Sequence, residues 1–227
     1  IDAGNLVLQN NAKIEMRSGE VPEGVAVGAL DVDAINLLRI ENSTISVSAT
    51  GADSARANVS LTAKYVELTS AKLENANYFS KVYNQGDIYL RDKAEPVFVS
   101  GYGKLEITAQ NAIVSKEGTI ISMQNGAVTM AASGMILDGT TVETETHWLL
   151  DSQDRNSQLT LMATGQLLLL NSQFDMETVS GGGRQTFTAT APVVQFKNSK
   201  LTLSDEVAGQ AGEVSIMGSQ SLTIENS

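Results

Sequence analysis

The sequence predicts an all-β fold, a right-handed parallel β-helix (solenoid) of about seven to eight turns with longer insertions on one side. Three observations lead to this prediction. Apolar and small residues recur at fixed offsets in successive segments of the chain. Within each segment they alternate with polar residues at a period of two, which is typical of strands with one buried face. Asn-Ser pairs follow at equivalent places, where asparagine tolerates the left-handed backbone of a sharp corner.

The repeat is clearest in the segment that starts at Gly126. Its apolar or small residues lie 2, 4, 6, 9, 11 and 16 positions further on: Val128, Met130, Ala132, Met135, Leu137 and Val142. Other segments fit the same offsets, some with one inserted residue. Eight copies can be placed, with starts at residues 28, 57, 86, 103, 126, 157, 185 and 212. The copies at 86 and 103 are poorer, and the stretch 86–125 is expected to be irregular.

Each copy is expected to contribute two short strands and a variable third side. The position six residues into the repeat carries a small residue, which suits a tight corner between the two strands: Ala34, Ala63, Ala109, Ala132, Ala163, Ala191 and Gly218. One copy cannot bury its own apolar face, but stacked copies form a continuous core. At about 4.8 Å per stacked strand, the turns would make a rod roughly 35–40 Å long.

The Asn-Ser pairs come after the second strand of a repeat. They are Asn42-Ser43, Asn171-Ser172, Asn198-Ser199 and Asn226-Ser227, with Asn10-Asn11 as a variant. Because the copies are in register, these side chains are expected to form a hydrogen-bonded ladder along the stack. The alternative interpretation is that Asn and Ser simply favour turns.

Residues 1–227 are expected to form a single β-helix segment. The chain starts and stops within repeats, and neither end offers the polar cap that usually covers the core of a solenoid. The sequence therefore predicts a segment of a longer rod, or one link in an assembly joined end to end.

Composition excludes several classes of protein. With 15 basic and 26 acidic residues the net charge is −11, which argues against nucleic acid and anionic lipid as partners. No apolar run approaches the length of a transmembrane helix. Cysteine is absent, so the chain has neither a disulfide framework nor a thiolate metal site.

The pattern resembles the repeats of filamentous-haemagglutinin-like exoproteins of two-partner secretion, which read Ala-Gly-x-Ile-x-Ile-x-Ala-x-x-Leu-x-Leu-x-Asn-Ser-x-Ile. Residues 210–227 match best, and residues 184–203 and 157–176 follow the pattern nearly as well. The resemblance implies a secreted or cell-surface rod: an adhesin, a matrix protein or a toxin-delivery stalk. The variable spacing and the stretch 86–125 depart from the family pattern.

The first candidate binding site lies in the insertion 143–154. It contains the sole histidine and the sole tryptophan, His147 and Trp148, followed by Asp151 and Asp154. An aromatic face suits stacking on sugar rings, and carboxylates and imidazole suit sugar hydroxyls. The alternative is that Trp148 and the two leucines after it form a strand that plugs the core, with solvated acids around it.

The second candidate is an aromatic cluster that includes Tyr78 and Tyr83. It could bind glycan or a neighbouring protomer, or simply pack over the side of the helix. No catalytic residue, metal ligand or cofactor site is predicted. A polysaccharide lyase or hydrolase on this fold would need carboxylates stacked on successive turns. The outward column three residues into the repeat is mostly hydroxyl: Asp31, Ser60, Tyr89, Glu106, Thr129, Thr160, Thr188 and Ser215.

The sequence thus favours a non-enzymatic, extracellular β-helical rod, either an adhesin stalk or a filament or matrix subunit. Host or matrix glycans or proteins are the expected partners, besides other copies of the chain. The competing interpretation is a polysaccharide-processing enzyme whose site lies along residues 143–154. Such an enzyme predicts carboxylates that converge, whereas a stalk predicts scattered acids.

Overall fold

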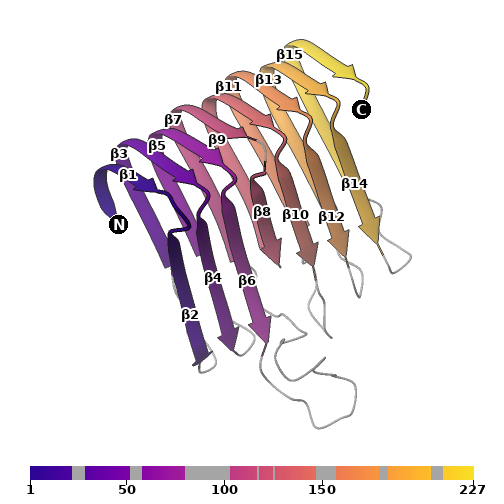
Figure 1. The fold of residues 1–227 in the computed structure, drawn as a ribbon. Helices are drawn as coiled ribbons and strands as arrows, with labels where there is room; N and C mark the ends of the chain where they lie inside the picture. The colour runs from indigo at the N-terminus through magenta and orange to yellow at the C-terminus, as the bar shows by residue number, and fades with distance from the viewer. Residues whose placement is uncertain are drawn as a thin grey trace, which may run out of the picture.

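The protein is a parallel β-solenoid, as the repeat predicts. The computed structural model describes residues 1–21, 29–51, 58–79, 103–116, 118–124, 126–146, 157–178, 184–205 and 212–227, which form fifteen strands in two sheets (Figure 1). Every strand pairs in parallel with strands of neighbouring coils, and helices are absent from the described ranges, so none of them provides a helix that could span a membrane.

The odd-numbered strands form the eight-stranded sheet. They are β1 (Asp2–Leu8), β3 (Ala29–Glu41), β5 (Asn58–Thr69), β7 (Gly103–Lys116), β9 (Gly126–Asp138), β11 (Ser157–Leu170), β13 (Gln185–Lys197) and β15 (Glu213–Glu225). The even-numbered strands form the seven-stranded sheet. They are β2 (Lys13–Val21), β4 (Thr44–Gly51), β6 (Lys72–Phe79), β8 (Ile120–Gln124), β10 (Thr141–Thr146), β12 (Gln173–Thr178) and β14 (Lys200–Asp205).

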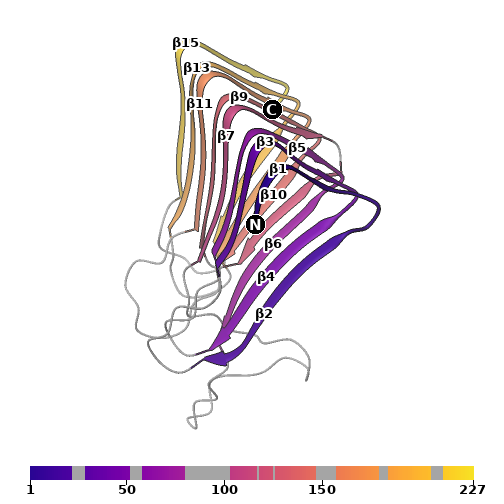
Figure 2. The same ribbon diagram turned by 90° about the vertical axis from the view of Figure 1, so that its left-hand side faces the viewer.

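The coils are three-sided, and Figure 2 shows them stacked one behind another. The first two sides belong to one long strand, where the sequence predicted two separate strands. The register shifts near the small residue predicted for the corner, for instance after Ala34, Ala63 and Ala163. The strand therefore bends there without breaking its hydrogen-bonded ladder.

The third side is also regular, which corrects the expectation of a variable third side. It consists of the short strands β2 to β14, which alternate inward and outward residues like the long ones. The segments of varied length connect each short strand to the next long one, from the single residue 125 to residues 80–102. The long insertions are thus confined to one corner of the coil.

The stretch from Gly103 to Gln124 proved regular, although the sequence suggested otherwise. It forms β7 and β8, which stack between β5 and β9 and between β6 and β10. Ser60 pairs directly with Glu106, so no coil intervenes between them. The weak copy that starts at Gly86, and with it Tyr89, lies outside the described residues.

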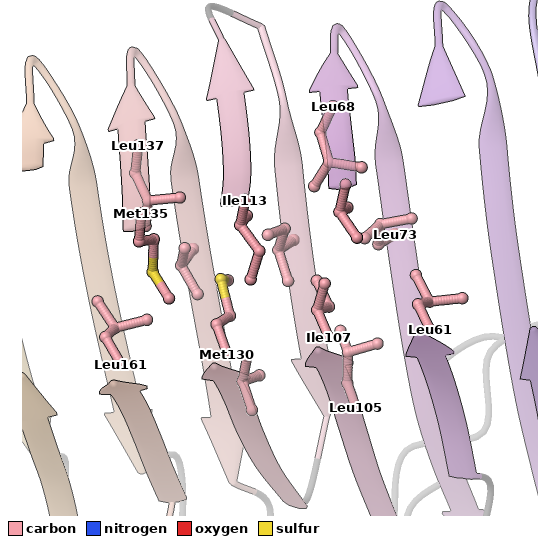
Figure 3. Packing of buried hydrophobic residues seen from close by; sticks show 14 of the residues in the cluster. Leu61, Leu68, Leu73, Leu105, Ile107, Ile113, Met130, Met135, Leu137 and Leu161 are labelled. Atoms are coloured by element: carbon pink, nitrogen blue, oxygen red, sulfur yellow. The ribbon is translucent and has the colours of Figure 1, made fainter. Parts of the chain in front are cut away.

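The core is a stack of inward-facing aliphatic ladders. Leu61, Ile107, Met130 and Leu161 occupy one register position in four successive strands, and all four are fully buried (Figure 3). Burying each such side chain contributes about 1.5–3 kcal/mol. Because the same inward position is apolar in each of these strands, the recurrence of apolar residues at fixed offsets was enough to predict the fold.

Aromatic rings replace aliphatic side chains in the last coils of the core. The rings of Phe174 and Phe187 meet edge to face, with centroids 5.6 Å apart, and Phe196 lies 6.0 Å from Phe174. Edge-to-face contact places the positive edge of one ring against the negative face of the other. These three rings join both sheets, since Phe174 belongs to β12 and the other two to β13.

The corner between each long strand and its short strand has a left-handed residue. Positive φ values occur at Asn11, Asn42, Ser70, Gly118, Gly139, Asn171, Asn198 and Asn226, and also at Asn10. The corner thus needs a residue that accepts positive φ, which asparagine and glycine do most readily. The predicted Asn-Ser sites are confirmed as corners, and three further corners use other residues.

The predicted side-chain ladder is present at the C-terminal corners. Asn198 Nδ2 donates to Asn171 Oδ1 over 3.3 Å, and Asn226 Nδ2 donates to Asn198 Oδ1 over 3.4 Å. Beneath them, Ser199 Oγ accepts from the backbone N–H of Ser172 and donates to the carbonyl of Leu169. These serines are almost fully buried, so their hydrogen bonds satisfy polar groups that would otherwise destabilise the core.

Candidate functional site

Most of the predicted site residues lie outside the described part of the chain. His147, Trp148, Asp151, Asp154 and Tyr83 all fall there, so their roles in ligand binding stay predictions. Tyr78 lies within β6, where its backbone pairs with Thr50 of β4. The structure does show where the insertion containing His147 is attached: it follows Thr146, the last residue of β10, and precedes Ser157, the first of β11.

Four carboxylates lie beside this attachment point, on β10 and β12. Glu143 pairs in register with Asp175, and Glu145 pairs with Glu177. Their neighbours Val142, Thr144, Phe174 and Met176 point inward and are buried. Because side chains alternate between faces along a strand, all four carboxylates project from the outer face of the seven-stranded sheet. We call them the acidic quartet.

The quartet brings like charges close together. Adjacent strands lie about 4.8 Å apart, so each pair has its carboxylates within a few ångströms of this spacing. Like charges directly opposite on paired strands are destabilising. One compensating contact is a hydrogen bond from Gln173 Nε2 to Asp175 Oδ2. The register of β10 and β12 therefore holds two like charges, Glu143 and Asp175, opposite each other.

Such paired carboxylates can take part in two kinds of chemistry. Carboxylate oxygens are ligands for hard cations such as Ca²⁺, and pairs of carboxylic groups serve as acid and base in glycoside hydrolysis. The described ranges contain no group of three or more Asp, Glu, His or Cys side chains arranged to hold a metal ion. The four carboxylates of the quartet thus form two acidic pairs and are not arranged as a metal-binding site.

Buried polar contacts line the inner side of the insertion corner. Thr144 Oγ1 and Ser157 Oγ share a short hydrogen bond across the attachment point of the segment 147–156. One coil further on, Gln185 Nε2 donates to Thr178 Oγ1 over 2.7 Å and to the carbonyl of Ser204 over 2.8 Å. Fully buried hydroxyl and amide groups with these partners hold the ends of β10, β11, β12 and β13 together.

Ion pairs on the eight-stranded sheet have a different arrangement from the quartet. Arg39 contacts Glu67 on the next coil over 2.7 Å, and Lys197 contacts Glu225 over 3.1 Å. The hydrogen bond from Arg39 Nε and the negative charge of Glu67 raise the pKa of Arg39 above its ordinary value. These two stacked pairs therefore combine opposite charges, whereas the quartet combines four negative groups.

Sequence reasoning missed the quartet because it followed a different column. The search for stacked carboxylates used the position three residues into the repeat, which is mostly hydroxyl. The quartet occupies outward positions next to Val142 and Phe174, the apolar residues that mark the third side. Extending the alternating pattern by one residue beyond Val142 and Phe174 gives the first pair of acids, Glu143 and Asp175. A further step of two residues gives the second pair, Glu145 and Glu177.

Comparison with known proteins returned no relative: no family model, no curated protein and no solved structure matches the chain. The protein is therefore defined by its fold class, a parallel β-solenoid repeat protein.

Proposed function

We propose that the protein is a non-enzymatic, extracellular β-helical rod, an adhesin stalk or a filament or matrix subunit. The observation that supports this proposal is the unbroken stack: every long strand from β1 to β15 pairs with its neighbours, over one continuous core. The resemblance of the repeats to filamentous-haemagglutinin-like exoproteins points the same way, and it is the basis for proposing a secreted or cell-surface location.

The geometry suits a mechanical role. Parallel strands hydrogen-bond along the axis of the stack, and the corner residues add side-chain hydrogen bonds in the same direction. A load applied along the stack would be shared by many hydrogen bonds at each coil. The net charge of −11 keeps such a rod soluble and disfavours non-specific association.

The proposed contacts to glycans or proteins belong to the insertions at one corner. Loops held by a rigid scaffold are common binding sites, and the insertion 143–154 contains Trp148 and His147. The test is a panel of polysaccharides, with and without calcium, measured for retention and for chain cleavage. Retention without cleavage, weakened by Trp148→Ala but not by Met162→Ala on another side, would support an adhesin.

A second candidate is a polysaccharide-processing enzyme, and the acidic quartet is the observation that favours it. Its carboxylates stack on two successive coils, which an enzyme of this type requires, and two of them, Glu143 and Glu145, shortly precede Asp151 in the sequence. Cleavage that is lost on Asp175→Asn and Asp151→Ala would replace the structural proposal with this one. Location is tested separately, by protease accessibility on intact producing cells.

A further inference from the structure

The outer face of the long strands beyond their bend has an aliphatic centre. We call this the lateral face; it comprises the outward residues of segments 37–41, 65–69, 112–116, 134–138, 166–170, 193–197 and 221–225. Its middle column places Val114, Ile136 and Leu168 side by side on β7, β9 and β11. Each lies between two buried residues, so its own side chain points outward and is only partly covered.

Further apolar residues extend this centre to both sides. Leu170 lies beside it on β11, and Leu37, Ala112 and Val193 lie on the opposite side of the middle column. Tyr65 adds a ring that is 43% exposed. Outward positions of a sheet that faces water are usually polar, so the adjacent aliphatic side chains of Val114, Ile136, Leu168 and Leu170 mark an interaction surface.

A column of alternating charges borders the patch. In order of the strands from β3 to β15 it reads Glu41, Thr69, Lys116, Asp138, Leu170, Lys197 and Glu225, and the last two form an ion pair within the chain. Lys116 and Asp138 are neighbours because Ser115 and Leu137, which precede them, are paired. From Glu41 to Lys197 the order of charges is negative, neutral, positive, negative, neutral, positive. When this order is reversed, each positive position becomes negative, each negative position becomes positive, and the neutral positions stay neutral.

We propose that the lateral face binds the lateral face of a second copy of this chain, with the two stacks antiparallel. The two copies are related by a two-fold axis that is parallel to the strands and passes between β7 and β9. The coils of the second copy then run in reverse order, so that β7 faces β9 and β3 faces β13. Lys116 then faces Asp138 of the second copy, and Glu41 faces its Lys197. Both contacts occur twice by symmetry, as in any two-fold interface. At the centre, Val114 packs on Ile136 of the second copy.

The size of the patch sets the strength of the pairing. Seven strands at about 4.8 Å and three outward columns about 6.7 Å apart give a face of roughly 29 by 13 Å. Two such faces bury roughly 750 Å², which is below the range of stable specific interfaces and fits a weak, transient complex. The dimer is therefore expected in the micromolar range, with a dissociation constant that responds to single substitutions. This inference concerns the lateral face alone and holds whether or not the protein is an extracellular rod.

The first test is sedimentation equilibrium of the intact chain over a range of concentrations. We expect reversible dimerisation, weakened about tenfold or more by Lys116→Glu, because like charges would meet across the axis twice. The double variant Lys116→Glu with Asp138→Lys restores opposite charges and should recover dimerisation. Thr160→Glu, an outward position before the bend, is the matched control and should leave the dissociation constant unchanged. A monomer at every concentration, or equal dimerisation of the Lys116→Glu variant, would overturn the proposal.

The second test fixes the direction of the two stacks. The chain has no cysteine, so single-cysteine variants are unambiguous. Packed sheet faces lie about 10 Å apart, too far for a direct disulfide, so a short bismaleimide is the appropriate linker. Glu41→Cys mixed with Lys197→Cys should cross-link, while either variant alone should not, since equal positions would lie about five strands apart. Cross-linking of each variant to itself would show a parallel pairing and contradict the antiparallel dimer.

Discussion

Asn198 donates a side-chain hydrogen bond to Asn171 of the preceding coil, and both residues have left-handed backbones, with φ of 49° and 48°. One residue type thus meets two requirements at this corner. Its backbone tolerates positive φ, and its amide joins adjacent coils. The two contributions can be separated by substitution, because glycine keeps the first and loses the second.

Asn198→Ala is expected to destabilise the protein more than Asn198→Gly. Alanine loses the amide hydrogen bonds and also strains the left-handed backbone, for a total of about 1–2 kcal/mol. Glycine loses the hydrogen bonds alone, so its cost should stay below about 1 kcal/mol. Urea denaturation of the three proteins gives the comparison. Equal stability of the alanine and glycine variants would mean that the backbone conformation contributes nothing.

Ala71→Ser is expected to stabilise the protein by about 0.5–1.5 kcal/mol. Ala71 is buried at the position that serine occupies in other coils, next to Thr119, whose hydroxyl is buried without a hydrogen-bond partner. By analogy with Ser199, a serine here would accept from the backbone N–H of Ser43 and donate to the carbonyl of Thr69. The ladder would then continue through the middle of the stack.

The control for Ala71→Ser is Ala189→Ser, at a fully buried position among core side chains. That hydroxyl would lack the corner partners and should cost about 1–3 kcal/mol. Thermal unfolding of both variants under the same conditions distinguishes them. If both serines destabilise equally, the corner offers no special hydrogen-bonding site.

Phe174→Ala is expected to cost about 3–5 kcal/mol, since it removes a fully buried ring that contacts Phe187 and Phe196. Met162→Ala, at an outward position 43% exposed, should change the free energy of unfolding by less than about 0.5 kcal/mol. Both values come from denaturant titration. A small loss at Phe174 would indicate that the neighbouring coils collapse into the space.

Glu143→Thr is expected to stabilise the protein in low salt by a few tenths to about 1 kcal/mol, because it removes the like charge opposite Asp175. The gain should shrink as ionic strength rises. Glu106→Thr is the control, since Glu106 pairs with Ser60 and Thr129 and has Lys104 4.0 Å away, so its replacement should bring no gain in stability. If calcium stabilises the native protein and not the Glu143→Thr variant, the quartet binds cations and its repulsion has a function.

The fold followed from the sequence because its determinants are local and repeated. Alternation around Val128 and Met130 marks the strand, and the recurrence of the same pattern near Leu159 marks its neighbour. The corners were predicted only in part. Gly118 and Gly139 adopt the same left-handed backbone as Asn171, but a search for Asn-Ser could not find them, since positive φ is a property of the backbone and not of one residue type.

The candidate site was harder to predict, for a reason of register. Whether Glu143 lies opposite Asp175 depends on where each coil turns, and the inserted residue after the bend of β11 shifts that position by one. The glycan-binding residues predicted at 147–154 belong to an insertion, which no repeat constrains. Periodicity predicts what the coils share, whereas a binding site is found where they differ.

Confinement of the long insertions to one corner has a consequence for how such a protein can change. Removing residues 157–184, one complete coil, would bring β9 against β13, where Val128 and Phe187 already occupy the inward position that both share with Leu159. Duplication of a coil would be equally compatible with its neighbours. The length of the stack can therefore change in steps of about 4.8 Å while its cross-section stays the same. The length of the rod and the ligand specificity of its insertions can thus evolve independently.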